Sequence, residues 1–160
     1  MKYDKIYQLT HDIDWFCKIG NIPMHFASNC GMLPRKVDNR EVNRKIQELV
    51  VGAPNLVERE HIIINDVYVR TRIGEEASEN AFNDYVRTFV EMAMKGFMSF
   101  DRLTEDGEDT YVWIAKPSEA VEVNFEGIPT YPEDVCGLFQ DTNKLVHVCC
   151  LDNNDYQLVP

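Results

Sequence analysis

The chain has 160 residues, of which 44% are hydrophobic and 27% are charged, and its formal net charge at pH 7 is −11. This length is typical of one domain, predicted over 1–160, and the hydrophobic content excludes a disordered chain. The negative charge repels nucleic acid backbones and anionic lipid surfaces, so we expect neither a nucleic acid partner nor membrane association.

Three further features of the sequence bear on its compartment. No apolar run reaches the length of about 18 residues that a membrane span needs, and the first residues lack the apolar segment of a signal peptide. The five cysteines are an odd number without Cys-x-x-Cys spacing, which argues against a disulfide scaffold. The sequence therefore predicts a soluble cytoplasmic protein.

The first part of the chain contains short elements. A loose alternation predicts a strand over Lys2–Leu9, whereas residues 12–19 suit a short helix and a strand equally well. The alternation in Ile22–Ala27 predicts a strand in which Pro23 requires a strand start or a sheet edge. The polar segment Asn29–Gly31 ends this strand as a turn.

A helix over about 38–51 has readable ends. Asp38 and Glu41 have the spacing of a capping box, and Gly52 followed by Pro54 is a usual helix end. Its apolar residues recur at helical spacing, namely Val42, Ile46, Leu49 and Val50. The opposite face carries Arg40, Arg44 and Lys45.

The second part of the chain is predicted to alternate between strands and one long helix. His61–Ile73 alternates as a strand bent around Asn65-Asp66, and 80–100 has the apolar spacing of a packing helix. Tyr111–Ala115 is apolar on both faces, as in a strand covered on both sides. Further strands are predicted over Val121–Phe125, Leu145–Cys150 and Tyr156–Val159.

These elements indicate the fold class α+β. We expect a single domain in which a mostly antiparallel sheet packs against two main helices, at about 38–51 and 80–100. Short turns between most strands favour antiparallel pairing, because parallel pairs need long crossover connections.

A local excess of positive charge marks a candidate anion site. Five basic residues and only two acidic ones lie within positions 35–45. The basic residues are Arg35, Lys36, Arg40, Arg44 and Lys45. A phosphate or carboxylate could use this field together with free N–H groups near the helix start. A solvated basic helix face that pairs with acidic neighbours explains the same residues.

Two other groups of residues are candidates. Arg70 and Arg72 share a predicted strand face with Tyr68 and could bind a planar anion through bidentate contacts, although exposed strands often carry such an alternation. His25, Ser28 and Cys30 supply a base and two nucleophiles, the residue types of acyl transfer. A structural turn is the alternative, because a Gly-x-Ser-x-Gly elbow is absent.

The sequence leaves two functions open. Its acidity and the lack of a catalytic signature favour a non-catalytic module that binds a basic protein partner, as inhibitor and immunity-type proteins do. The alternative is a phosphate- or nucleotide-handling transferase or hydrolase that binds a small anionic ligand with the loop and helix of residues 25–45. Pairs of His and Cys provide at most two metal ligands where zinc needs three or four, so we expect no metal and no cofactor.

Overall fold

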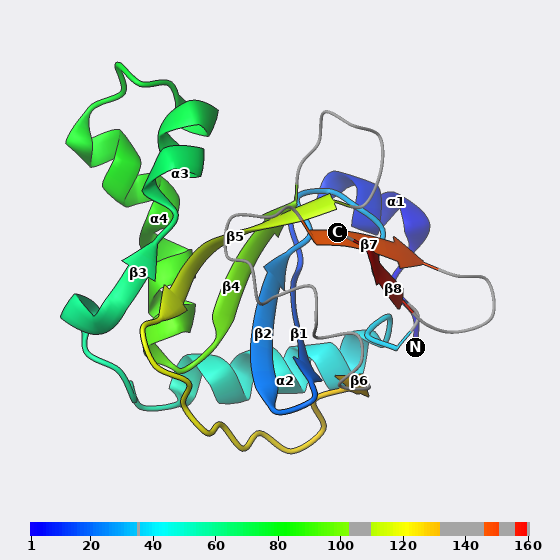
Figure 1. Ribbon diagram of the computed structural model, residues 1–160. Helices are drawn as coiled ribbons and strands as arrows, with labels where there is room; N and C mark the ends of the chain where they lie inside the picture. The colour runs from blue at the N-terminus through cyan, green and yellow to red at the C-terminus, as the bar shows by residue number, and fades with distance from the viewer. Residues whose placement is uncertain (35, 103–109, 132–145, 151–155, 160) are drawn as a thin grey trace.

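The computed structural model describes residues 1–34, 36–102, 110–131, 146–150 and 156–159 (Figure 1). Its helices are α1 (Lys5–Thr10), α2 (Arg40–Gly52), α3 (Asp66–Ile73) and α4 (Glu79–Met94), with a 3-10 turn η1 (Arg59–His61). Its strands are β1 (Asp14–Ile19), β2 (Ile22–Ala27), β3 (Ile62–Ile64), β4 (Met98–Arg102), β5 (Thr110–Pro117), β6 (Thr130–Tyr131), β7 (Val146–Cys150) and β8 (Tyr156–Val159). The predicted α+β class is confirmed, and no helix of the described ranges is long and apolar enough to cross a membrane.

The strands form one mixed sheet in the order β6-β1-β2-β4-β5-β7-β8, with β3 paired to β5. Most pairings are antiparallel, as predicted, but β2 pairs with β4 and β1 with β6 in parallel. The β2–β4 register begins at Met24 opposite Met98. Pro23 therefore lies at the strand start, where its missing N–H interrupts no bond to β4.

Helix α2 ends as predicted but begins differently. Its N-cap is Asn39, whose side chain accepts a hydrogen bond from the Val42 N–H, whereas Asp38 accepts one from the Tyr3 N–H at 2.8 Å. The capping box predicted at Asp38 is therefore wrong. The buried stripe is also shifted toward Asn43, Ile46 and Val50, and it leaves Val42 and Leu49 exposed.

Helix α4 begins where the sequence predicts and ends earlier. The Ser78 hydroxyl caps it by accepting from the Ala81 N–H at 3.1 Å. Its buried residues follow the predicted helical spacing, namely Phe82, Val86, Phe89, Val90, Met92 and Ala93. The helix ends at Met94 because Gly96 has a φ of +102°, and the remainder of the predicted helix becomes β4.

Three predicted strands are contradicted. The predicted strand Lys2–Leu9 overlaps helix α1 (Lys5–Thr10), whose Ile6 and Tyr7 N–H groups donate to the Asp4 carboxylate. In His61–Ile73 only Ile62–Ile64 is a strand, because the Asn65 side chain caps α3. Val121–Phe125 forms no strand; it buries Val123 between exposed neighbours without pairing in the sheet.

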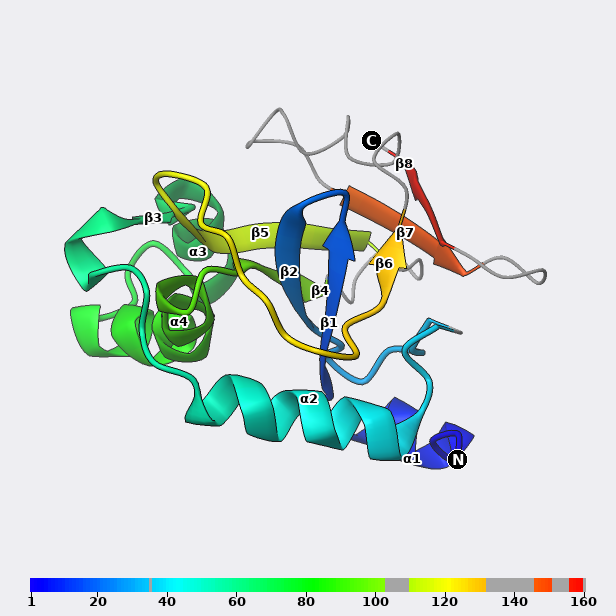
Figure 2. The same cartoon turned by 90° about the horizontal axis from the view of Figure 1, so that it is seen from below.

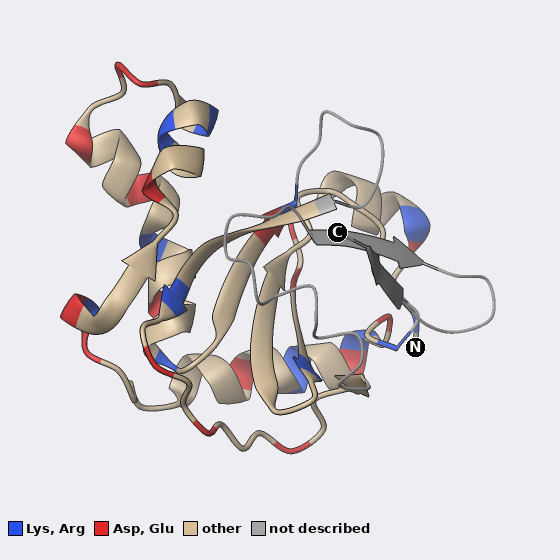
Figure 3. Cartoon of the chain, in the orientation of Figure 1, with Lys and Arg blue, Asp and Glu red and all other residues tan. Residues whose placement is uncertain are grey.

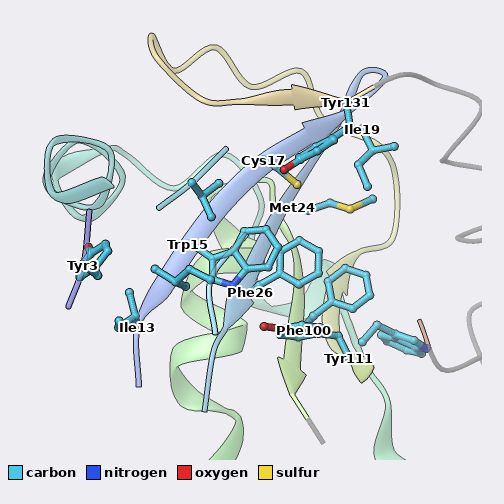
Figure 4. Close-up of a cluster of buried hydrophobic side chains, with 13 residues drawn as sticks. Tyr3, Ile13, Trp15, Cys17, Ile19, Met24, Phe26, Phe100, Tyr111 and Tyr131 are labelled. Carbon is cyan, nitrogen blue, oxygen red and sulfur yellow. The ribbon is translucent and has the colours of Figure 1, made fainter. Parts of the chain in front are cut away.

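The core lies on both faces of the sheet. One face carries stacked aromatic rings, with Trp15 on Phe26 at a centroid distance of 4.1 Å and Phe26 on Phe100 at 4.8 Å (Figure 4). Helices α2 and α4 cover the other face (Figure 2). Strand β5 contributes Tyr111 to the aromatic cluster and Val112 to the cluster under α4, so the prediction of a strand covered on both sides is confirmed.

Candidate functional site

A chain of hydrogen bonds crosses three neighbouring strands on the face covered by the helices. His25 in β2 lies opposite Ser99 in β4, and its Nδ1 is 2.6 Å from the Ser99 Oγ. Its Nε2 is 2.8 Å from Oδ1 of Asp14 in β1. An ionised carboxylate can only accept, so Nε2–H donates to Asp14, and in the neutral imidazole Nδ1 then accepts from the Ser99 hydroxyl. Together these bonds hold the Asp14 carboxylate in one orientation.

Only one of these three hydrogen-bonded side chains is accessible from outside the protein. His25 and Ser99 are fully buried, and the rings of Phe16 and Phe89 lie against the imidazole at centroid distances of 5.3 and 6.2 Å. The Asp14 side chain is 41% exposed. Burial therefore excludes Ser99 as an accessible nucleophile in this conformation, and Asp14 is the exposed end of the three hydrogen-bonded side chains.

Two cavities meet at Asp14. A cavity of about 410 Å³ lies between α1, α2 and β1 and is lined by Tyr3, Tyr7, Asp12, Ile13, Asp14, Phe16, Arg40, Arg44, Gln47, Val51 and Met92. A second cavity of about 370 Å³ lies beside α3 and α4 and is lined by Asp12, Asp14, Ala27, Asn29, Arg72, Tyr85, Thr88, Phe89 and Asp101. Because Asp12 and Asp14 line both, we name the two cavities together the Asp14 cleft.

Helix α2 helps to orient the start of β1. Asn43 and Gln47 lie one turn apart, and their side-chain amides donate to the Asp14 backbone C=O at 3.0 and 2.8 Å. The Asn43 amide also donates to the Tyr3 hydroxyl at 3.0 Å. These bonds explain why α2 buries an asparagine in the middle of its apolar stripe, and they fix the position of Asp14 relative to the basic residues of the same helix.

The structure separates the predicted anion-binding residues into different environments. Arg40 and Arg44 line the first cavity, and the Arg40 guanidinium lies over the Tyr7 ring at 5.6 Å. Arg70 forms an ion pair with Glu79 at 2.8 Å, whereas Arg72 lines the second cavity. Arg70 and Arg72 therefore do not share a strand face, and Arg35 lies outside the described residues.

Asp101 and its partners form a buried charged group in the second cavity. Its Oδ2 accepts from the Tyr85 hydroxyl at 2.6 Å and lies 3.7 Å from Nε of Arg72. Burial raises the pKa of Asp101 and also the pKa of Tyr85. Burial would lower the pKa of Arg72, but Tyr68, Tyr85 and Asp101 raise it overall. Arg72 therefore stays charged beside the carboxylate it compensates.

The three predicted catalytic residues are not brought together. The buried Ser28 Oγ accepts from the Ile13 N–H at 2.7 Å and faces the His11 C=O at 3.5 Å, so it ties the loop before β1 to the end of β2. Cys30 is exposed in a turn where Asn29 and Cys30 both have positive φ. The turn prediction is confirmed, and the hydrogen-bonding partners of His25 are Asp14 and Ser99 instead.

Metal-type donors gather elsewhere. Within the ranges that the structure describes, Glu58, Glu60 and His61 form the one group whose ligand atoms lie close enough for a metal ion, and all three are exposed. None of them lines the Asp14 cleft. Exposed acidic side chains of this kind are common on protein surfaces without a bound ion, so this group does not indicate a metal site.

Asp14 and Ser99 are not predictable as site residues from the sequence, because no sequence pattern places them next to His25. His25 is 11 residues from Asp14 and 74 residues from Ser99, and only the strand register makes them neighbours. Comparison of the chain with protein-family models, with curated proteins and with solved structures finds no match.

Proposed function

We propose that the protein is an enzyme that handles a small phosphate- or carboxylate-bearing substrate in the Asp14 cleft. The observation that carries the proposal is the hydrogen-bonded chain from Ser99 through His25 to Asp14. Burying polar groups in an apolar core is costly unless each is satisfied. Here the buried groups lead to a half-exposed carboxylate that lines both cavities, an arrangement that suits a general base.

The charges around Asp14 support this chemistry. His25 engages Oδ1, so Oδ2 keeps its lone pairs for a proton on a substrate or on an attacking water. Arg40 and Arg44 line the same cavity, and a guanidinium can hold a phosphate or carboxylate through paired hydrogen bonds. The proposed site therefore uses the basic helix of the 25–45 segment together with Asp14, and it makes no use of Ser28 or Cys30.

A thermal-shift screen of inorganic phosphate, nucleotides, sugar phosphates and small carboxylates tests the binding step. A ligand at 100 times its dissociation constant stabilises the folded state by about 2.7 kcal/mol. We expect a shift that is lost when Arg40→Ala and Arg44→Ala are combined and kept in Lys45→Ala, which removes a charge from the same helix outside the cavity. The binding proposal fails if no anion raises the midpoint, or if the double variant keeps the shift.

Turnover is tested with the compounds that bind. Each is incubated with the wild-type protein and with Asp14→Asn, and phosphorus or proton NMR follows the bond that breaks. Because the amide can still accept from His25 but cannot act as a base, we expect Asp14→Asn to lose turnover even at concentrations of the compound that saturate the variant. Equal turnover by both proteins would remove Asp14 from the mechanism.

A second candidate is the non-catalytic binding of a basic protein. The turn between α3 and α4 carries the exposed Glu75 and Glu76 and lies at a projecting end of the molecule (Figure 3). The side chain of Val67 on α3 is 79% exposed. An acidic tip suits a partner of opposite charge, as in inhibitor and immunity-type proteins, and Val67, at the other end of α3, adds an exposed apolar side chain to the same helix.

Co-purification at two salt concentrations tests this candidate. The Debye length falls from about 10 Å at 0.1 M salt to about 3 Å at 1 M, so a partner held by charge is retained only at the lower concentration. We expect Glu75→Gln with Glu76→Gln to weaken retention. If the tagged protein retains nothing at low salt, the binding-module candidate is contradicted.

A further inference from the structure

We propose that the ligand of the Asp14 cleft is a zwitterion, a small molecule with an ammonium group at one end and a phosphate or carboxylate at the other. This inference rests on the proposed function and narrows its substrate class. It follows from how charges of both signs are placed around the larger cavity and from which of them are already paired.

Carboxylates and guanidinium groups line this cavity without forming ion pairs with one another. Asp12 and Asp14 lie on its wall together with Arg40 and Arg44, yet among the described residues no ion pair of 4.0 Å or less joins either carboxylate to either guanidinium. The cavity that all four residues line has a volume of about 410 Å³, within the usual range for small-molecule sites. A ligand that carries both charges can contact both sets of side chains at once.

The two carboxylates are held in place with an oxygen left over. Oδ1 of Asp12 accepts from the Asn29 backbone N–H at 2.8 Å, and Oδ1 of Asp14 accepts from His25 at 2.8 Å. Neither bond brings a positive charge from Lys or Arg. Both Oδ2 atoms therefore remain acceptors for a donor group from outside the protein.

Nearby cations do not compensate these carboxylates. Among the described residues, Arg72 forms its ion pair with Asp101, at 3.7 Å, and not with Asp12 or Asp14. Asp101 also accepts a hydrogen bond from the Tyr85 hydroxyl. No third carboxylate, imidazole or thiol of the described chain converges with Asp12 and Asp14 as a metal site requires. An ammonium group, which needs only a few well-placed acceptors, fits the pair better than a divalent ion does.

The guanidinium groups that α2 contributes to the cavity are available for the anionic end of the ligand. Within the described ranges, Arg40 contacts the Tyr7 ring and forms no ion pair, and Arg44 on the next turn of α2 is exposed and likewise unpaired. Two guanidinium groups one turn apart can share one phosphate or carboxylate. The anionic end of the ligand therefore lies toward α2 and its ammonium end toward the start of β1.

Pairs of compounds that differ only in the ammonium group test whether the ligand is a zwitterion. Dissociation constants are measured by NMR titration for 2-aminoethyl phosphate, 3-aminopropyl phosphate and β-alanine, and for ethyl phosphate, propyl phosphate and propanoate, which lack the ammonium group. We expect an aminoalkyl anion to bind about tenfold tighter than its partner, as a charge-assisted hydrogen bond provides. The phosphate and carboxylate pairs together identify which anion the site prefers.

Variants locate the ammonium end. Asp12→Asn with Asp14→Asn keeps an acceptor for Asn29 and His25, so we expect folded protein that binds both members of a pair equally. Asp84→Asn removes an exposed charge from α4 outside the cleft and should keep the tenfold preference. If thermal melting shows that the double variant is unfolded, Asp12→Asn alone is used and should reduce the preference.

The outcomes separate this inference from the proposed function. Equal binding of an aminoalkyl anion and its partner by the wild-type protein overturns the zwitterion and leaves the anion site standing. Binding of no probe at all overturns both. A preference that survives in the double Asp→Asn variant overturns the position given to the ammonium group.

Discussion

At the scale of single residues, His25 links the core of the protein to its cleft. It is fully buried and it occupies both ring nitrogens in hydrogen bonds, one to Ser99 and one to Asp14. An apolar residue of similar size would fill the same space but would leave the Ser99 hydroxyl buried without its partner. The stability of the protein and the orientation of Asp14 should therefore depend on the same side chain.

We predict that His25→Leu lowers the free energy of unfolding by about 1–3 kcal/mol, the cost of leaving a buried polar group unsatisfied. Urea unfolding followed by circular dichroism measures this change. His61→Leu, at an exposed position of η1, should alter stability by less than about 0.5 kcal/mol. Similar effects of the two substitutions would show that the His25 hydrogen bonds contribute nothing to the fold.

Asp101 gives the folded protein a pH dependence of known sign. Burial raises its pKa above the ordinary value of 3.8, so the folded protein holds a proton that the unfolded chain has released. Stability therefore falls as pH rises from about 3.8 through the raised pKa. In Asp101→Asn this fall should disappear, so the variant gains stability relative to the wild type across that window.

Urea unfolding at half-unit steps from pH 4 to pH 8 measures the difference between the two proteins. Glu76→Gln, an acid-to-amide change at an exposed position, serves as the control and should give a nearly constant difference from the wild type. If the stability difference between Asp101→Asn and the wild type is equally constant with pH, the buried Asp101 carboxylate is not the cause of the pH dependence.

At the scale of elements, glycine defines the end of α4. Gly96 has a φ of +102°, and a Cβ added there would lie 2.5 Å from Cγ2 of Val123. Gly52, the last residue of α2, has no such φ and no atom within 4 Å of an added Cβ. The two glycines therefore allow the same substitution to be compared at a restricted and at an open position.

We predict that Gly96→Ala destabilises the protein by about 1–3 kcal/mol, through the left-handed backbone and the clash with Val123. Gly52→Ala should leave stability unchanged or raise it by up to about 1 kcal/mol, because alanine reduces the freedom of the unfolded chain and favours a helix. Thermal unfolding of both variants measures the contrast. Equal midpoints would mean that neither the positive φ of Gly96 nor the contact with Val123 lowers the stability of the variant.

Elements with a strong apolar period were predictable, and those defined by caps were not. Residues of α4 repeat at helical spacing, and β5 is apolar on both faces, so both were recognised. Helix α3 buries only Val69, so its residues carry no helical period and their alternation resembles a strand. Its start is decided by the Asn65 side chain, and competition between such local bonds and strand pairing is not visible in periodicity.

The site was predictable only in its basic part. Arg40 and Arg44 stood out because charge of one sign accumulates in a continuous segment, and both line the cleft. Asp14, His25 and Ser99 come from separate strands, and their proximity depends on a register that one sequence does not specify. The same limit applies to Arg70 and Arg72, whose separation follows from α3 being a helix.

At the scale of the whole molecule, the described strands form one sheet with core on both faces. Both tryptophans of the sequence, Trp15 and Trp113, are buried in the aromatic cluster, whereas α2 and α4 pack on the opposite face (Figure 2). Tryptophan fluorescence therefore reports on one face of the sheet, and far-UV circular dichroism reports mainly on the helices of the other face.

We predict that the two signals change at the same urea concentration, because one sheet joins both faces in a single cooperative unit. Fluorescence and circular dichroism recorded on the same samples measure both midpoints. The emission maximum of the folded protein should be blue-shifted, since both indole rings are buried. Midpoints that differ beyond error would contradict the prediction of one domain over 1–160.

The parallel pairing of β2 with β4 has a consequence for how the chain is made. The β1–β2 hairpin can close once residue 27 has left the ribosome, whereas the strand that pairs with β2 begins at Met98. At about 5–20 residues per second, β4 leaves the ribosome several seconds after the hairpin does. Throughout that interval the edge of β2 lacks its partner β4 and the ring of Phe26 lacks Phe100, so the nascent hairpin carries an open strand edge that can pair with another chain.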